Sequence, residues 1–267
     1  MATSAAVTPH RLSFGDVCMG RAPKRFYLVL WLPLLTVLWA GCFFIAWRAY
    51  PNYQFPNHDI SFLGHPALNP QGWWYWSLGM GIASVMMFPP VRHLSRQMHE
   101  ITLGQNQSPR RFVSMGSFCL HLSCVGLMGL ALAPQGERFD LVHKASGALA
   151  MGGMYATLLI LWSAPLFKAV PMSIGRVATL LFSTWWGVIG FLLTQGYRFF
   201  AYGELGRVLK HKHESILLRF SLWEWMLFVA GTTAFVVFFA FLPSQDPQKA
   251  KAAQKKREEP VRAPLLQ

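Results

Sequence analysis

Charged residues are scarce in this chain of 267 residues. They make up 13% of the sequence, whereas soluble domains carry about 25%. Hydrophobic residues reach 53% and gather in long blocks instead of alternating with charge. A block of about 20 apolar residues is long enough to cross a bilayer as a helix. The composition therefore excludes a soluble globular enzyme and a disordered chain, and it indicates a polytopic helical membrane protein.

Cysteine is also scarce, and the motifs of several site classes are absent. The four cysteines form neither a C-x-x-C pair nor a spaced framework, which excludes a disulfide scaffold. The sequence has no nucleophile elbow, zinc-protease motif, phosphate-binding loop or dinucleotide fingerprint. His121, in the middle of an apolar block, has no opposing histidine at its depth for a haem, and the other histidines match no zinc pattern. We therefore expect no cofactor and no metal centre.

Acidic residues are a minority of the charged ones. Eleven Asp and Glu stand against 24 Lys and Arg, which gives a formal net charge of +13. The basic residues lie mostly in loops and tails beside apolar blocks, where they set the orientation of the spans. Because no basic stripe or nucleic-acid motif accompanies them, we expect no nucleic-acid partner.

Six apolar blocks predict an all-α fold, a bundle of six transmembrane helices in a multi-pass integral membrane protein. The polar segment before the first block lacks a signal-peptide pattern, so this block is expected to be a retained span. We divide the chain into a cytoplasmic N-terminal segment 1–26, a six-helix transmembrane domain 27–242 and a disordered, charged cytoplasmic tail 243–267. The blocks run Tyr27–Trp47, Trp73–Val91, Phe112–Ala133, His143–Pro165, Ile174–Gln195 and Leu218–Leu242.

The distribution of positive charge predicts that both termini are cytoplasmic. Counted over alternate loops, sixteen Lys and Arg lie on the side of the termini and eight on the other side. The basic loop 196–217 lies on the outer side against this trend. Either this loop contacts an anionic surface such as phospholipid head groups, or its charge is tolerated. A bacterial inner membrane and a eukaryotic endomembrane both fit the pattern.

Small and aromatic residues inside the blocks predict how the helices pack. Ala148, Gly152 and Ala156 repeat every four residues in the fourth block, as do Ser183 and Gly187 in the fifth. Small residues at this spacing let helix backbones approach, so we expect these faces to contact neighbouring helices. Tryptophans at the block ends predict anchors at the membrane interface. They are Trp73, Trp74, Trp76, Trp223 and Trp225.

Polar residues at the mouths of the spans are the candidates for a functional site. With the N-terminus inside, these candidates gather at the outer ends of the spans. As ligand-binding residues we predict Asp59, Ser61, His65, Asn69, His143, Arg198, Arg219 and Glu224. The candidates for a catalytic role are His143, Asp140, Glu224 and Asp59.

Two of these residues permit more than one interpretation. Glu224 lies in the apolar stretch LRFSLWEWMLFV, where a carboxylate needs a partner or a proton, and His143 and Arg219 are the expected partners. It acts either on a ligand or through an interhelical hydrogen bond that locks the sixth span. Asp140 precedes His143 by three residues and so lies on the same helical face, where it can orient the imidazole. Alternatively, His143 caps a helix at the membrane interface.

The outer loop and the span ends resemble a known superfamily. This six-span group contains the DRAM autophagy modulators, the FRAG-type Golgi protein of GPI-anchor lipid remodelling, and uncharacterised bacterial relatives. Its loop motif is matched by Ile60, Ser61, Gly64, Asn69 and Pro70, its histidine at the head of span four by His143, and its Glu-Trp pair by Glu224 and Trp225. The resemblance covers residues 25–243 and implies a role near membrane lipid. Asp59 departs from the bacterial pattern by one position.

Three functions compete at this point. The leading hypothesis is a lipid-handling or lipid-sensing protein whose site lies at the outer membrane face, with membrane lipid as its partner. The second is an intramembrane lipid hydrolase or acyltransferase with His143 as general base. The third is a structural subunit of a larger membrane complex, with protein partners. The sequence leaves open whether the chain is an enzyme.

Overall fold

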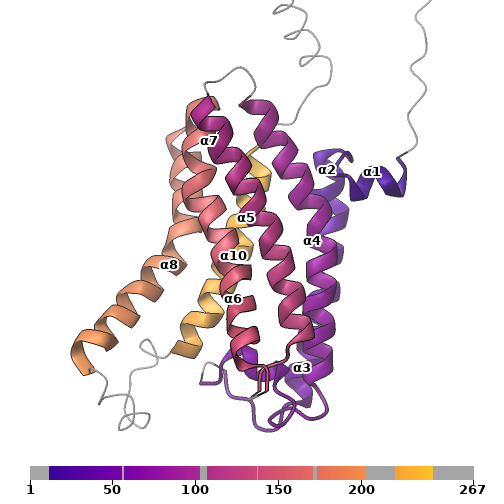
Figure 1. Ribbon diagram of the computed structural model, residues 1–267, viewed down its shortest axis with the longest axis vertical. Coiled ribbons are helices and arrows are strands. Elements are labelled where there is room, and N and C mark those ends of the chain that lie inside the picture. Colours follow the sequence, from indigo (N-terminus) through magenta and orange to yellow (C-terminus); the bar gives the residue numbers. More distant parts are fainter. Residues whose placement is uncertain are drawn as a thin grey trace, which may run out of the picture.

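The computed structural model describes residues 12–55, 57–102, 107–136, 138–170, 173–202 and 220–242. In these residues all regular secondary structure is helical, which confirms the predicted all-α class. The long helices run up and down a single bundle (Figure 1). The charged tail 243–267 and most of the basic loop 196–217 lie outside the described residues.

Neighbouring helices in the chain are mostly neighbours in the bundle. α4 packs on α3 and α5, α5 packs on α6, and α8 packs on α10. The short helix η2 lies in the loop between α3 and α4. The elements are α1 (Phe14–Cys18), α2 (Lys24–Phe26), η1 (Tyr27–Trp31), α3 (Leu32–Ala49), η2 (Ile60–Gly64), α4 (Trp73–Ile101), α5 (Gln107–Leu132), α6 (Asp140–Tyr155), η3 (Ala156–Leu161), α7 (Ser163–Ala169), α8 (Ile174–Tyr202) and α10 (Phe220–Phe241).

Fewer helices qualify as membrane spans than the six predicted blocks. In the described part of the chain, four are long and apolar enough: Lys24–Ala49, Gln107–Leu132, Asp140–Phe167 and Ser221–Phe241. A fifth counts if the two halves of α8, which bend by 42°, form one span. α4 is not among them, since it contains Trp, Tyr and Pro and ends in polar residues. The chain is thus a multi-pass membrane protein with four or five such helices, and the sixth span stays a prediction.

Two prolines inside α4 explain how this helix is joined to the first span. A proline has no N–H, so it leaves free the carbonyl four residues before it. Pro90 thereby frees the carbonyl of Met86, and the indole N–H of Trp31 donates to that oxygen at 2.7 Å. The indole of Trp31 in η1 therefore supplies the hydrogen bond that the backbone of α4 lacks at Met86.

The first and last long helices meet at one end of the bundle. Lys24 Nζ donates to the carbonyl oxygen of Ala240 at 2.7 Å and also to that of Leu242. A cation at this position satisfies the free carbonyls that end α10. The two ends of the described chain therefore lie on the same side of the bundle, as the predicted topology requires (Figure 1). Their cytoplasmic orientation remains a prediction.

A small apolar core seats the loop between α3 and α4 at the opposite end. Ile60 and Leu63 of η2 are buried with Phe43 of α3 and Trp76 of α4. Gly64 makes this approach possible, because a Cβ atom there would lie 2.5 Å from the Trp76 ring. The loop is thus packed into the end of the bundle instead of projecting from it.

The small residues of α6 pack differently from the sequence prediction. Ala148 is exposed, and a Cβ atom on Gly152 would meet nothing within 4 Å, so the prediction that these two face a neighbouring helix is wrong. The face that contacts α5 carries Ser146, Ala150 and Gly153 instead. Adjacent residues of an α-helix point about 100° apart, so this face differs from the predicted one although Gly152 and Gly153 are neighbours.

The corresponding prediction for α8 is confirmed. Ser183 is buried, and a Cβ atom on Gly187 would lie 2.6 Å from the side chain of Ala230 on α10. Small residues therefore do bring α8 and α10 together.

Adjacent glycines on α6 give a matched test of this packing. A Cβ atom on Gly153 would lie 2.5 Å from the backbone oxygen of Cys119. We expect Gly153→Leu to lower the free energy of unfolding by about 1–3 kcal/mol, as overpacking does. Gly152→Leu should stay within roughly 0.5 kcal/mol of the parent, because its side chain points into open space. Thermal unfolding in detergent measures both, and equal losses in the two variants would contradict the assigned face.

Candidate functional site

Three residues near the start of α10 form hydrogen bonds to the loop after α3. Glu224 Oε2 accepts from the backbone N–H of Ile60 at 2.9 Å. The indole N–H of Trp225 donates to the Tyr53 hydroxyl at 3.1 Å, and the Ser221 hydroxyl donates to the Asn57 carbonyl at 3.2 Å. We call these residues, together with Asp59 and Ser61, the loop–α10 junction.

Glu224 obtains its partner from the start of a short helix. The first N–H groups of any helix lack acceptors inside it, so they attract a negative charge. Ile60 begins η2, and Ser61 adds hydrogen bonds from both its amide and its hydroxyl. The partner expected for Glu224 was a histidine or an arginine, whereas the structure supplies backbone and serine donors. No hydrogen bond or ion pair joins Glu224 to His143 within the described residues, and the Arg219 side chain lies outside them.

Asp59 lies next to this carboxylate and completes an acidic pair. It is half-buried, and its charge acts on Glu224. Burial raises the pKa of Asp59 above its ordinary value of 3.8, and the nearby His58 and a contact with the Ser221 hydroxyl oppose this shift. The carboxyl group of Asp59 is partly accessible, and its ionisation at this half-buried position costs free energy.

Tyr53 links the two halves of the junction. Its hydroxyl accepts from Trp225 and donates toward the carbonyl oxygens of His58 and Asp59, at 3.1 and 3.2 Å. Burial raises the pKa of this hydroxyl, so it remains a neutral donor. Tyr53 is not among the predicted site residues, because a tyrosine in an outer loop is usually an interface residue.

Asn69 is fully buried and joins the loop to the end of α3. Its Nδ2 group donates to the carbonyl oxygens of Ala46 at 3.0 Å and Leu63 at 2.8 Å. Both amide hydrogens are therefore used in joining the end of α3 to η2. Gly72 lies directly against this amide, where a Cβ atom would come within 2.5 Å of Oδ1. The contacts of Asn69 position the loop.

His65 also makes contacts within the loop. Its Nδ1 accepts from the backbone N–H groups of Ala67 and Leu68, at 3.1 and 3.2 Å. The ring thereby closes the turn that leads to Asn69. The side chain of Arg198, another predicted ligand-binding residue, lies outside the described residues.

His143 is buried and is oriented by a backbone carbonyl. Its Nδ1 lies 2.8 Å from the carbonyl oxygen of Ala133, which can only accept, so Nδ1 carries the proton. The ring lies 5.8 Å from that of Trp76. Asp140 instead binds Lys144 at 2.6 Å on the exposed side of the helix. The residue expected to orient His143 is thus paired elsewhere.

Two of the tryptophans expected as anchors at the membrane interface make contacts within this end of the bundle. Trp76 is 1% exposed and packs on Gly64 and His143, whereas Trp74 is 44% exposed, as an interface anchor would be. Trp225 is half-buried and donates to Tyr53. Trp76 and Trp225 therefore support the loop.

The described residues hold no group of three or more His, Cys, Asp and Glu side chains that could bind a metal ion. The chemistry at the junction is that of two carboxyl groups and two serine hydroxyls. These groups accept hydrogen bonds from amines and alcohols.

Comparisons with protein-family models, with curated proteins and with solved structures found no match for this chain.

The raised pKa of Asp59 predicts a pH dependence of stability. A carboxyl group whose pKa is higher in the folded state than in the unfolded state binds more protons when folded, so stability falls as pH rises from 3.8 through the raised value. Asp59→Asn removes this loss. We expect its unfolding temperature to exceed that of the parent at about pH 7, with a smaller difference near pH 4.

Asp140→Asn is the matched control, because this acid lies at the same end of the bundle but is exposed and bound to Lys144. It should show no gain at neutral pH. A gain for Asp59→Asn of the same size at both pH values would show that charge burial is not its cause.

Proposed function

We propose that this multi-pass membrane protein binds a membrane lipid, with the head group held at the loop–α10 junction. Glu224 and Asp59 accept hydrogen bonds from donor groups of the head group, and the loop covers the site. The proposal belongs to the lipid-handling class that the resemblance to the DRAM and FRAG-type proteins implies.

The observation that carries the proposal is the acidic pair itself. Glu224 and the loop are 164 residues apart in sequence at their hydrogen bond, yet they bring two carboxyl groups and the hydroxyls of Ser61 and Ser221 to one end of the bundle. Glu224 already accepts from Ile60 and Ser61, whereas Asp59 is only half-buried. Asp59 therefore offers an accessible acceptor at this end of the bundle.

The geometry favours binding over catalysis. A general base of the kind expected for a hydrolase or acyltransferase needs a partner that stabilises its protonated form, usually a carboxylate. His143 has a backbone carbonyl in that place, and its nearest aromatic neighbour is Trp76. No feature of the junction favours a subunit of a larger complex over lipid contact.

Two common phospholipids provide a direct test. Phosphatidylethanolamine and phosphatidylcholine have the same net charge, but only the former carries N–H donors. In nanodiscs that contain both, native mass spectrometry of the released protein should show preferential retention of phosphatidylethanolamine. Charge-assisted hydrogen bonds contribute roughly 1.5–3 kcal/mol, which corresponds to a preference of about tenfold or more.

Variants then assign the preference to the junction. Glu224→Gln keeps an oxygen that accepts from Ile60, so it should fold and lose most of the preference, as should Asp59→Asn. Asp140→Asn, at the same end but bound to Lys144, should retain it. Equal retention of the two lipids by the parent protein, or a preference that survives in both junction variants, would refute the proposed site.

A further inference from the structure

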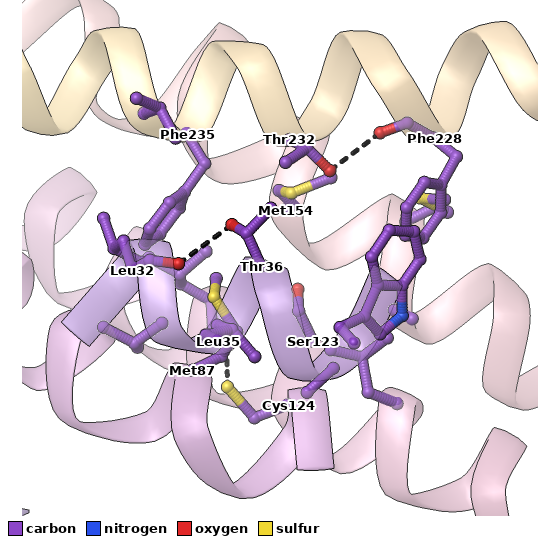
Figure 2. A pocket seen from close by; sticks show the side chains of 18 residues that line it. Leu32, Leu35, Thr36, Met87, Ser123, Cys124, Met154, Phe228, Thr232 and Phe235 are labelled. Atoms are coloured by element: carbon purple, nitrogen blue, oxygen red, sulfur yellow. Dashed lines mark hydrogen bonds between the residues drawn. The ribbon is translucent and has the colours of Figure 1, made fainter. Parts of the chain in front are cut away.

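A cavity of about 150 Å³ lies in the middle of the bundle, beneath the loop–α10 junction. It is bounded by α3, α4, α5, α6 and α10, and Figure 2 shows the side chains that surround it. Leu32, Leu35, Met87, Met154 and Phe235 are among them. Apolar cavities of this size in soluble proteins stay dry and accept small apolar molecules.

The few hydroxyl groups along the cavity are already satisfied. Thr36 Oγ1 donates to the Leu32 carbonyl at 2.8 Å, and Thr232 Oγ1 donates to the Phe228 carbonyl at 3.0 Å (Figure 2). Ser123 Oγ likewise donates to the Cys119 carbonyl at 3.2 Å. The hydroxyl hydrogens of these three side chains are therefore already used within the helices and are not free to bind a polar group.

The cavity opens sideways between α3 and α10. Three of its lining residues, Thr36 on α3 and Thr232 and Val236 on α10, are exposed on the outer surface of the bundle. None of the lining residues from the other three helices is exposed: some, such as Leu120 and Ala150, are buried, and others, such as Met87 and Met151, are partly buried. The mouth is therefore on the side of α3 and α10.

Contacts between the first span, Lys24–Ala49, and α10 close this opening at both ends. Toward the junction, the Trp39 ring stacks on that of Phe228, with centroids 4.8 Å apart and planes at 15°. At the other end, Lys24 binds the last carbonyls of α10, and Tyr27 lies 6.0 Å from Phe239. The opening is thus a slit that lies between these contacts, along the part of α3 from Leu32 to Trp39 that lines the cavity.

The slit faces the hydrocarbon of the bilayer, because both helices that form it are apolar enough to span a membrane. We propose that the cavity binds part of one aliphatic chain of a membrane lipid, which enters sideways between α3 and α10. The inference rests on the proposed function, since it names the part of the lipid that the bundle holds. The head group and the chain nevertheless contact different residues, so each site can be tested alone.

Two adjacent threonines separate chain binding from general lipid contact. Thr232 and Thr233 are both exposed on α10, but only Thr232 lines the cavity. Thr232→Phe would fill the mouth of the slit, whereas Thr233→Phe would add the same ring to the lipid-facing surface. Both positions are open, so both variants are expected to fold, which thermal unfolding checks. On α3, Thr36→Phe with Val37→Phe as its control gives a second, independent pair.

The probe is a phospholipid with a diazirine group on its acyl chain, incorporated in nanodiscs and activated by light. In the parent protein, crosslinked peptides should include the buried lining residues Leu120 and Phe235. Thr232→Phe should lower the yield at these residues about tenfold, equivalent to about 1.4 kcal/mol of lost chain binding, while Thr233→Phe leaves it unchanged. Crosslinks confined to lipid-facing side chains such as Phe118, or equal yields in Thr232→Phe and Thr233→Phe, would overturn the inference.

The results also distinguish this inference from the proposed function. One result is a protein that shows no preference between the two head groups but loses its crosslinks at Leu120 in Thr232→Phe. This result would support the chain site and refute the head-group site. A head-group preference in a protein whose crosslink yield at Leu120 is unchanged by Thr232→Phe would support the head-group site and refute the chain site.

Discussion

The loop between α3 and α4 is held in place by a carboxylate that lies one turn inside an apolar helix. Removing such a group from water is costly, so it must find donors. Glu224 finds them at the start of η2, where the backbone N–H of Ile60 has no acceptor of its own. This bond fixes the loop on α10, and the contacts of Trp225 with Tyr53 and of Ser221 with Asn57 follow from the same placement.

Aromatic rings connect this end of the bundle to the cavity below it. Trp225 contacts Phe43 at 6.0 Å, Phe43 contacts Trp39 at 4.5 Å, and Trp39 stacks on Phe228 at the outer edge of the slit. The polar junction and the apolar cavity therefore follow one another along α3 and α10. A lipid whose head group lies at the membrane surface and whose chain extends inward has the same arrangement.

The sequence was sufficient to locate the helices, because long apolar blocks leave the backbone no alternative in a membrane. It also showed that Glu224 needs a partner. It could not name that partner, since a backbone N–H has no sequence signature and depends on where η2 packs. α6 carries small residues on two different faces, and spacing alone did not indicate that Gly153, and not Gly152, contacts α5. The cavity depends on the separation of α3 and α10, and local sequence patterns do not determine the distance between two helices far apart in the chain.

The most direct measurement is amide hydrogen exchange at Ile60, resolved to single residues, in nanodiscs. If Glu224 holds the loop, replacement by Leu should accelerate exchange of this amide about tenfold, since a net hydrogen bond contributes roughly 1–1.5 kcal/mol. Glu224→Gln, which keeps an acceptor, should exchange at nearly the parent rate, and amides within α4 and α5 should be unaffected. An Ile60 amide that exchanges equally fast in all three proteins would contradict the account.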